Sequence, residues 1–214
     1  MILFRRIFFA HSFAATLVAM VISSSAIAGN WPAWRGPTGD GITLETNLPI
    51  HWSATQNVRW KTALPERGNS TPVVWGERVF VTQAVGDKRT LICFNRKDGK
   101  LLWQQGVTSK EKELTHATNP YCSASPVTDG ERVIVSFASD GLYCYDFSGR
   151  EMWSRTDLGP QSHIWGGAVS PMIYQETCVL NFWPGANTYL LAVNKRTGAT
   201  LWKNIEETGF GMND

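Results

Sequence analysis

Three segments of the sequence repeat at a spacing of about 50 residues, and each ends in a tryptophan. The segments run from Thr71 to Trp103, from Ser125 to Trp153 and from Ser170 to Trp202. A period near 50 residues is typical of propeller blades. Helical arrays are excluded, since they use shorter units rich in Leu and Ala. The repeat therefore predicts an all-β chain of successive blades. The residues shared by the segments include Pro72, Pro126, Pro171, Gly99, Gly149 and Gly198.

Each repeat divides into four short strands at its turn signals. In the first repeat, apolar runs at 73–74, 79–81 and 91–94 precede a fourth strand that ends at Trp103. The runs are separated by sequences rich in Gly and Asp, which favour tight hairpin turns. No stretch has the apolar spacing of a long amphipathic helix. Four-stranded blades are the unit that this pattern predicts.

The end of each repeat resembles the tryptophan-docking motif of pyrroloquinoline-quinone (PQQ) type propeller repeats, A-x-[DN]-x-x-T-G-x-x-x-W. Residues 192–202 (AVNKRTGATLW) match it, 93–103 (CFNRKDGKLLW) resemble it, and 144–153 (CYDFSGREMW) are one residue shorter. The resemblance covers residues 58–205. It implies a turn capped by Asn or Asp, a left-handed glycine, and an indole between adjacent blades. The docking residues it implies are Trp103, Trp153, Trp202, Gly99, Gly149 and Gly198.

The sequence predicts three parts. These are a signal peptide at 1–28, an N-terminal Trp/Pro-rich wrap at 29–57, and a partial PQQ-like β-propeller at 58–214, with blades at 70–106, 123–156 and 168–205. Val58 to Leu64 has the phase of an outer strand, with Trp60 at the docking position. We expect about three blades plus one outer strand, as in a quinoprotein alcohol dehydrogenase-like ring that is incomplete. Either the chain is partial, which we favour, or something else covers the open edges.

The first 28 residues have the features of an export signal. Arg5 and Arg6 precede an apolar stretch at 7–22 and a small-residue cleavage site that ends at Ala28. A membrane anchor is the alternative, but polar residues interrupt the apolar run. We therefore expect a periplasmic or secreted protein with no stable membrane span after cleavage.

Charge excludes one class of partner. The formal net charge of +2 comes from 20 Lys and Arg against 18 Asp and Glu, and the two leader arginines account for it. The mature chain is thus near neutral and has no run of basic residues. Nucleic acid is therefore not an expected partner.

The sequence offers no recognised catalytic or metal motif. Cys93, Cys122, Cys144 and Cys178 lack metal-ligand or redox spacing. Cys93 and Cys144 occupy the repeat position that Ala192 occupies in the third segment. This favours buried core residues over a disulfide, although export would permit one.

The longer loops between strands are the candidate functional region, because loops on a rigid scaffold carry binding residues. They contain aromatic, amide and imidazole groups that could contact a ligand. A quinone cofactor would need such aromatic faces and a calcium ion held by oxygen ligands, and carboxylates are scarce here. The alternative, which we favour, is that Trp165 and Trp183 pack between blades and the Asn residues cap turns. The candidates are His116, Asn119, Tyr121, His163, Trp165, Asn181, Trp183 and Asn187.

Two functions remain open. The first is an exported non-catalytic PQQ-like β-propeller, a binding or scaffold module for a protein, peptide or polysaccharide on the long-loop face. It needs no cofactor. The alternative is a fragment of a PQQ-dependent alcohol or sugar dehydrogenase, which would bind PQQ with calcium. Repeats of this type occur mostly in proteins that do not bind the cofactor, as the resemblance implies, and fold alone does not fix function.

We predict cleavage after Ala28, because the small-residue site follows an apolar stretch without acidic residues. N-terminal sequencing of the exported protein should begin at Gly29. Recovery of an intact Met1 in the membrane fraction would contradict this prediction.

Overall fold

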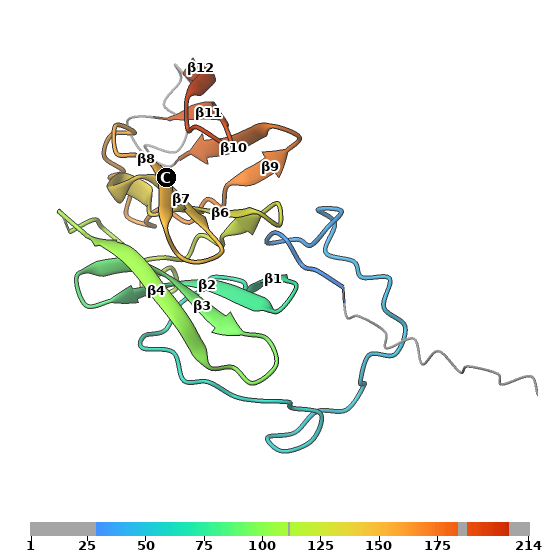
Figure 1. Cartoon of the computed structure of the whole chain (residues 1–214). Helices are drawn as coiled ribbons and strands as arrows, with labels where there is room; N and C mark the ends of the chain where they lie inside the picture. The colour runs from blue at the N-terminus through green and yellow to red at the C-terminus, as the bar shows by residue number, and fades with distance from the viewer. Residues whose placement is uncertain (1–28, 111, 184–187, 206–214) are drawn as a thin grey trace, which may run out of the picture.

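The computed structural model describes residues 29–110, 112–183 and 188–205. The predicted signal peptide with its Ala28 cleavage site, the candidate Asn187 and the tail 206–214 lie outside these residues. The described chain forms three four-stranded antiparallel sheets that follow one another like the blades of a fan (Figure 1). The predicted all-β class and four-stranded blades are therefore confirmed.

The strands of each blade run in chain order from the inner to the outer edge of the fan. Blade one consists of β1 (Val73–Trp75), β2 (Arg78–Val85), β3 (Lys88–Asn95) and β4 (Leu101–Thr108). Blade two consists of β5 (Val127–Thr128), β6 (Arg132–Ser136), β7 (Leu142–Asp146) and β8 (Glu151–Arg155). Blade three consists of β9 (Met172–Tyr174), β10 (Thr177–Phe182), β11 (Tyr189–Asn194) and β12 (Thr200–Ile205). The helical element in the described residues is one 3-10 turn, η1 (Ala138–Asp140).

One row of paired residues crosses every blade and ends at its closing tryptophan. A β-bulge precedes each of these tryptophans, so that Leu102, Met152 and Leu201 have no partner in the register. An extra residue of this kind re-aims the side chains beside it. The rows are Val73–Phe80–Cys93–Trp103, Val127–Ile134–Cys144–Trp153 and Met172–Val179–Ala192–Trp202.

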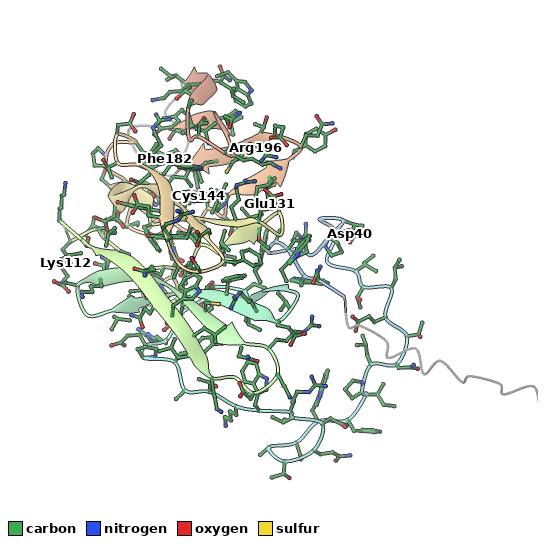
Figure 2. The ribbon with its side chains drawn as sticks, in the orientation of Figure 1. Asp40, Lys112, Glu131, Cys144, Phe182 and Arg196 are labelled. Atoms are coloured by element: carbon green, nitrogen blue, oxygen red, sulfur yellow. The ribbon has the colours of Figure 1, made fainter. Side chains whose placement is uncertain are left out.

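The core lies between the blades. The rows of blades one and two pack against alternate residues of the next blade, such as Tyr143 in blade two and Leu180 in blade three. Because neighbouring side chains of a strand point to opposite faces, blade two buries one face against blade one and the other against blade three. In Figure 2, Cys144 and Phe182 lie inside this interface, and Glu131 and Arg196 lie at the surface where blades two and three meet. Their charged groups are 3.6 Å apart.

The turn before each closing strand provides the surface on which the preceding tryptophan packs. Gly99, Gly149 and Gly198 have φ values of 70°, 89° and 72°, in the left-handed region. A Cβ atom on any of them would come within 2.5 to 2.9 Å of an indole ring. We call this space above each glycine an indole seat. Trp103 fills the seat at Gly149, and Trp153 fills the seat at Gly198.

Each seated indole also donates its N–H to the next blade. The Nε1 atoms of Trp103 and Trp153 lie 3.0 Å from the carbonyl oxygens of Phe147 and Lys195. These carbonyls belong to the turns that the Asp146 and Asn194 side chains cap by accepting backbone N–H bonds. The turn therefore fixes both the shape and the acceptor of the docking site.

A second set of hydrogen bonds joins the blades at the start of their inner strands. The backbone N–H of Thr71 donates to Ser125 Oγ at 2.8 Å, and the N–H of Ser125 donates to Ser170 Oγ at 2.9 Å. These residues precede the prolines of the three repeats. The blades are therefore held at both edges, by hydroxyl groups inside and by indoles outside.

The expected outer strand at residues 58–64 is not a strand in the structure, because no sheet partner lies beside it among the described residues. A strand is stable only in a hydrogen-bonded ladder. Trp60 nevertheless fills the seat at Gly99, and its Nε1 atom donates to the carbonyl of Arg96 at 2.8 Å. The docking position was thus predicted correctly, whereas the local secondary structure was not.

The docking tryptophans differ in burial, which leads to a stability prediction. Trp153 is 8% exposed and Trp202 is 47% exposed. Trp153→Ala should lower the free energy of unfolding by about 3–5 kcal/mol, the usual cost of emptying a large core site. Trp202→Ala should cost less than about 1 kcal/mol in the same denaturant titration. Equal losses of unfolding free energy in the two variants would contradict the prediction that the buried Trp153 packs between blades and the exposed Trp202 does not.

Candidate binding surface

Four connecting segments meet on one face of the fan. They are the loops after β4 and β8, the η1 turn of blade two, and the connection between β10 and β11. Asn119 Nδ2 donates to the carbonyl of Trp165, and Gln161 Nε2 donates to that of Trp183. The backbone N–H of Gln161 donates to Ser139 Oγ at 2.7 Å. Because these bonds tie each segment to another, the loops form one continuous surface.

Two histidine–tryptophan pairs lie on this surface. The ring centroids of His116 and Trp165 are 4.4 Å apart, and those of His163 and Trp183 are 6.3 Å apart. Trp165 is 48% and Trp183 37% exposed. We call these four residues the loop-face ridge. Exposed indoles beside imidazoles offer apolar area together with hydrogen-bonding groups, which is typical of binding surfaces.

The remaining candidates lie in other positions. Asn119 holds the ridge in place through the hydrogen bond that its side chain donates to the carbonyl of Trp165. Tyr121 is half-buried, and its hydroxyl donates to the carbonyl of Glu113 at 2.6 Å. Asn181 lies on the outward face of blade three and lines a groove of about 730 Å³ that Asn119 also lines. The structure thus brings four of the described candidates together at the ridge, with Asn119 beneath them.

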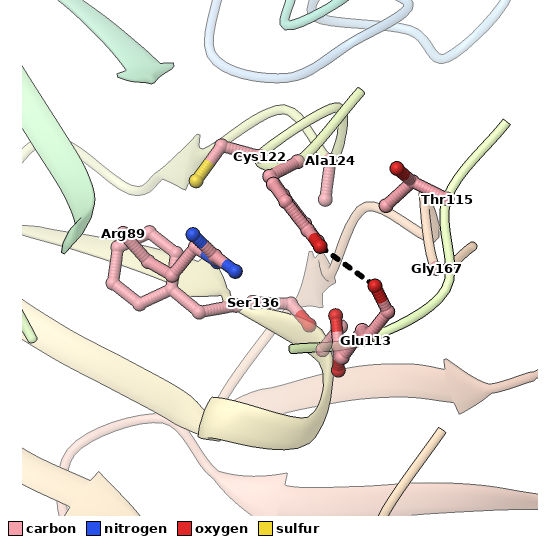
Figure 3. A pocket seen from close by; sticks show the side chains of 10 residues that line it. Arg89, Glu113, Thr115, Cys122, Ala124, Ser136 and Gly167 are labelled. Atoms are coloured by element: carbon pink, nitrogen blue, oxygen red, sulfur yellow. Dashed lines mark hydrogen bonds between the residues drawn. The ribbon is translucent and has the colours of Figure 1, made fainter. Parts of the chain in front are cut away.

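A polar cluster lies under the loops (Figure 3). Arg89, which is 4% exposed, stands over the ring of Tyr121 at 3.8 Å and lies 3.7 Å from Asp140. Glu113 Oε1 accepts the backbone N–H of Ser139 at 2.7 Å. The cavity between Arg89, Glu113 and Tyr121 measures about 10 Å³. That is about the room that one water needs, so the cluster braces the loops and has no space for a larger ligand.

Burial shifts the ionisation of Glu113. Removal from water raises the pKa of its carboxyl group, the nearby Asp140 adds to this rise, and the hydrogen bond from Ser139 opposes it. No motif or spacing in the sequence marks Glu113 for this role. Glu113, Arg89 and Gln161 were therefore missed as loop-bracing residues, because partners in different blades leave no signal in local spacing.

The four cysteines are buried thiols with no disulfide between them. Burial raises the pKa of Cys93 to about 11 and that of Cys122 to about 12. Such thiols stay protonated at neutral pH and are poor nucleophiles. Within residues 29–110, 112–183 and 188–205, no group of three His, Cys, Asp or Glu lies close enough to hold a metal ion. In the same part of the chain, no helix is long and apolar enough to cross a membrane.

Similarity to known proteins identifies the kind of chain. A family model described as outer membrane protein assembly factor BamB matches residues 45–156, just over half of the 214 residues. A curated relative of that name from Xanthomonas campestris is 32% identical over 143 residues, which cover 65% of this chain and 31% of the relative. Another from Alkalilimnicola ehrlichii is 27% identical over 147 residues, 68% of this chain and 35% of the relative. The chain thus spans about a third of the length of these relatives.

A solved structure supports the fold. The quinohemoprotein alcohol dehydrogenase ADHIIG from Pseudomonas putida HK5 superposes with a TM-score of 0.50 and 18% identity, over 69% of this chain and 22% of the enzyme. At that identity the likeness concerns the fold alone. The blades and seats therefore define a β-propeller protein of the PQQ-like type. The chain belongs to the family whose model is described as outer membrane protein assembly factor BamB.

The partly buried Glu113 leads to a pH prediction. Because its pKa is raised in the folded state, the folded chain binds its proton more tightly than the unfolded chain does. The stability that this group contributes is full below its unfolded pKa of about 4.3 and falls as the pH rises through the folded value. Glu113→Gln should remove this fall, seen as the difference between the two unfolding curves from pH 4 upward. A constant difference at every pH would contradict the prediction.

Proposed function

We propose that the chain is an exported, non-catalytic propeller module that binds a protein partner during assembly of the outer membrane. The observation that carries the proposal is the loop-face ridge, where Trp165 and Trp183 are exposed on a braced surface. Two curated relatives named as outer membrane protein assembly factors support the choice of process. The predicted signal peptide at 1–28 and a periplasmic location are consistent with this role.

The domain division follows the same proposal. Residues 29–57 form the wrap, 58–214 form the propeller part, and the long loops carry the recognition surface. A protein segment suits the ridge better than a charged ligand does, because the side chains of the ridge are indole and imidazole rings without a carboxylate or a Lys or Arg among them. Exposed aromatic anchors of this kind dominate the energetics of many interfaces. The proposal needs no cofactor.

Complementation in the source bacterium tests the role of the ridge. Deleting the gene should lower the amount of folded barrel protein in the outer membrane, and the wild-type chain should restore it. The double variant Trp165→Ala, Trp183→Ala should restore it poorly, because two anchors are lost, while its melting curve stays close to wild type. Trp52→Ala is the matched control, since it removes an indole that is 66% exposed and outside the ridge. Full restoration by the double variant would rule out the ridge as the binding surface.

A cofactor test separates the proposal from the dehydrogenase alternative. PQQ and Ca²⁺ are added to the purified chain, and dye reduction is followed with a panel of alcohols and aldoses. We expect no saturable quenching of tryptophan fluorescence and no turnover, because the described loops offer few carboxylates for calcium. Turnover that is abolished by Trp165→Ala or Asn181→Ala would establish the enzyme instead.

A further inference from the structure

The start of the wrap is hydrogen-bonded to the inner strands of two blades. Trp31 exchanges two backbone hydrogen bonds with Val74 of β1, at 2.8 and 2.9 Å. The next carbonyl along the chain, that of Pro32, accepts the backbone N–H of Thr128 in β5 at 2.9 Å. The wrap is therefore fixed to blades one and two within the first residues after the predicted cleavage site.

Gly29, which directly follows the predicted cleavage site, is held at both of its backbone groups. Its nitrogen donates to Glu45 Oε1 at 2.5 Å, and its carbonyl oxygen accepts from Arg96 Nη2 at 3.4 Å. The chain returns to Gly29 through a turn in which the N–H of Gly41 donates to the carbonyl of Arg35 at 2.9 Å. In Figure 1 this blue segment runs to the edge of β1, turns back and returns past its own start. The turn thus brings a carboxylate to the nitrogen of Gly29.

The Glu45 carboxylate forms no ion pair within the described part of the chain. Among the described residues, its side chain accepts one hydrogen bond, from the nitrogen of Gly29. In the uncleaved chain that donor is a neutral peptide N–H. Hydrolysis of the Ala28–Gly29 amide by an export peptidase adds water across the bond, leaving a carboxylate on Ala28 and an amine on Gly29. The amine binds a proton and is mostly an ammonium at neutral pH. Cleavage therefore places a cation where Glu45 has none.

The groove around this contact suits a cation. It measures about 590 Å³, and its described lining contains the carboxylates of Asp40 and Glu45 and no Lys or Arg. The Asp40 carboxylate already accepts two hydrogen bonds within its own turn, so Glu45 is the available acceptor. Arg96 is the cation that approaches Gly29, and it bonds to the carbonyl oxygen on the other side of the residue. An ammonium has three donors, and the groove leaves room for water on those that Glu45 does not bind.

We propose that Glu45 is the binding site of the mature amino terminus, so that the α-ammonium of Gly29 pairs with its carboxylate and closes the wrap into a loop against blade one. The proposal rests on the predicted cleavage after Ala28 and is independent of the loop-face ridge. Cleavage strengthens the contact, because a hydrogen bond between two charged groups is stronger than one from a neutral donor. Both groups are exposed, so the pair fixes the start of the wrap and adds little to the stability of the blades.

The reactivity of the α-amine tests the proposal in the full chain, exported with its own leader in the source bacterium. The purified protein is treated with a limiting amount of an N-hydroxysuccinimide ester at pH 7, and mass spectrometry follows acylation of the N-terminal peptide. Only the unprotonated amine reacts, and a paired carboxylate favours the protonated form. Glu45→Gln, which keeps an acceptor oxygen but removes the charge, should therefore react about two- to fivefold faster than wild type, the range expected for an exposed ion pair. Glu151→Gln is the matched control, because Glu151 is exposed on β8 and lies outside the groove.

Intact mass and salt dependence separate the ways in which the proposal can fail. A mature mass that does not begin at Gly29 overturns it at its premise, the site of cleavage. A mass that begins at Gly29 with equal rates for wild type and Glu45→Gln overturns the pairing alone, as does equal acceleration in Glu151→Gln. The ratio of the two rates should approach one in 1 M salt, because salt screens an exposed pair. A ratio that salt leaves unchanged would also contradict the ion pair. None of these outcomes bears on the ridge, which the complementation experiment tests separately.

Discussion

The hydrogen bond from each indole to the next blade's turn is the interaction on which the architecture depends. It requires a carbonyl that points outward from the turn, and a residue without a side chain next to it. Gly149 meets both needs, because its left-handed φ of 89° shapes the turn and its missing Cβ admits Trp103. A side chain at this position would both strain the turn and displace the indole ring of Trp103. One glycine in each repeat therefore satisfies two requirements, the conformation of the turn and the packing of the indole from the preceding blade.

Charged groups add selectivity at the same interface. Asp129 of blade two lies 3.1 Å from the ammonium of Lys195 in blade three, and both are mostly buried. Burial raises the pKa of Asp129, but the N–H groups of Glu131 and Arg132 and the cation of Lys195 outweigh it, so the net shift is downward. Buried pairs of this kind contribute little net stability, yet an unpaired partner is costly. They therefore favour this order of blades over others with similar apolar rows.

The sequence predicted what depends on local, repeated chemistry. The blades, their hairpins and the docking positions all follow from signals within about a dozen residues, such as the Asp98–Gly99 turn. It did not predict contacts between loops of different blades. The hydrogen bond from Ser139 to Glu113 and the tilted ring contact of His116 with Trp165 join residues with no shared period. The strand expected at 58–64 failed for a related reason, because strand formation depends on a neighbour that local sequence does not describe.

The residues that hold the blades together are different from those that we propose for recognition. The seats and the hydroxyl contacts lie at the edges of the blades, while the loop-face ridge rests on segments that no seat uses. Under the proposed function, substitution in the ridge can therefore change what is bound without disturbing how the blades pack, as is usual for loops on rigid sheets. The cluster of Arg89, Glu113 and Tyr121 connects the blades to the loops that carry the ridge. It fixes the height of the loops above blades one and two, so the exposed rings are held in place before any partner arrives, which reduces the ordering cost of binding.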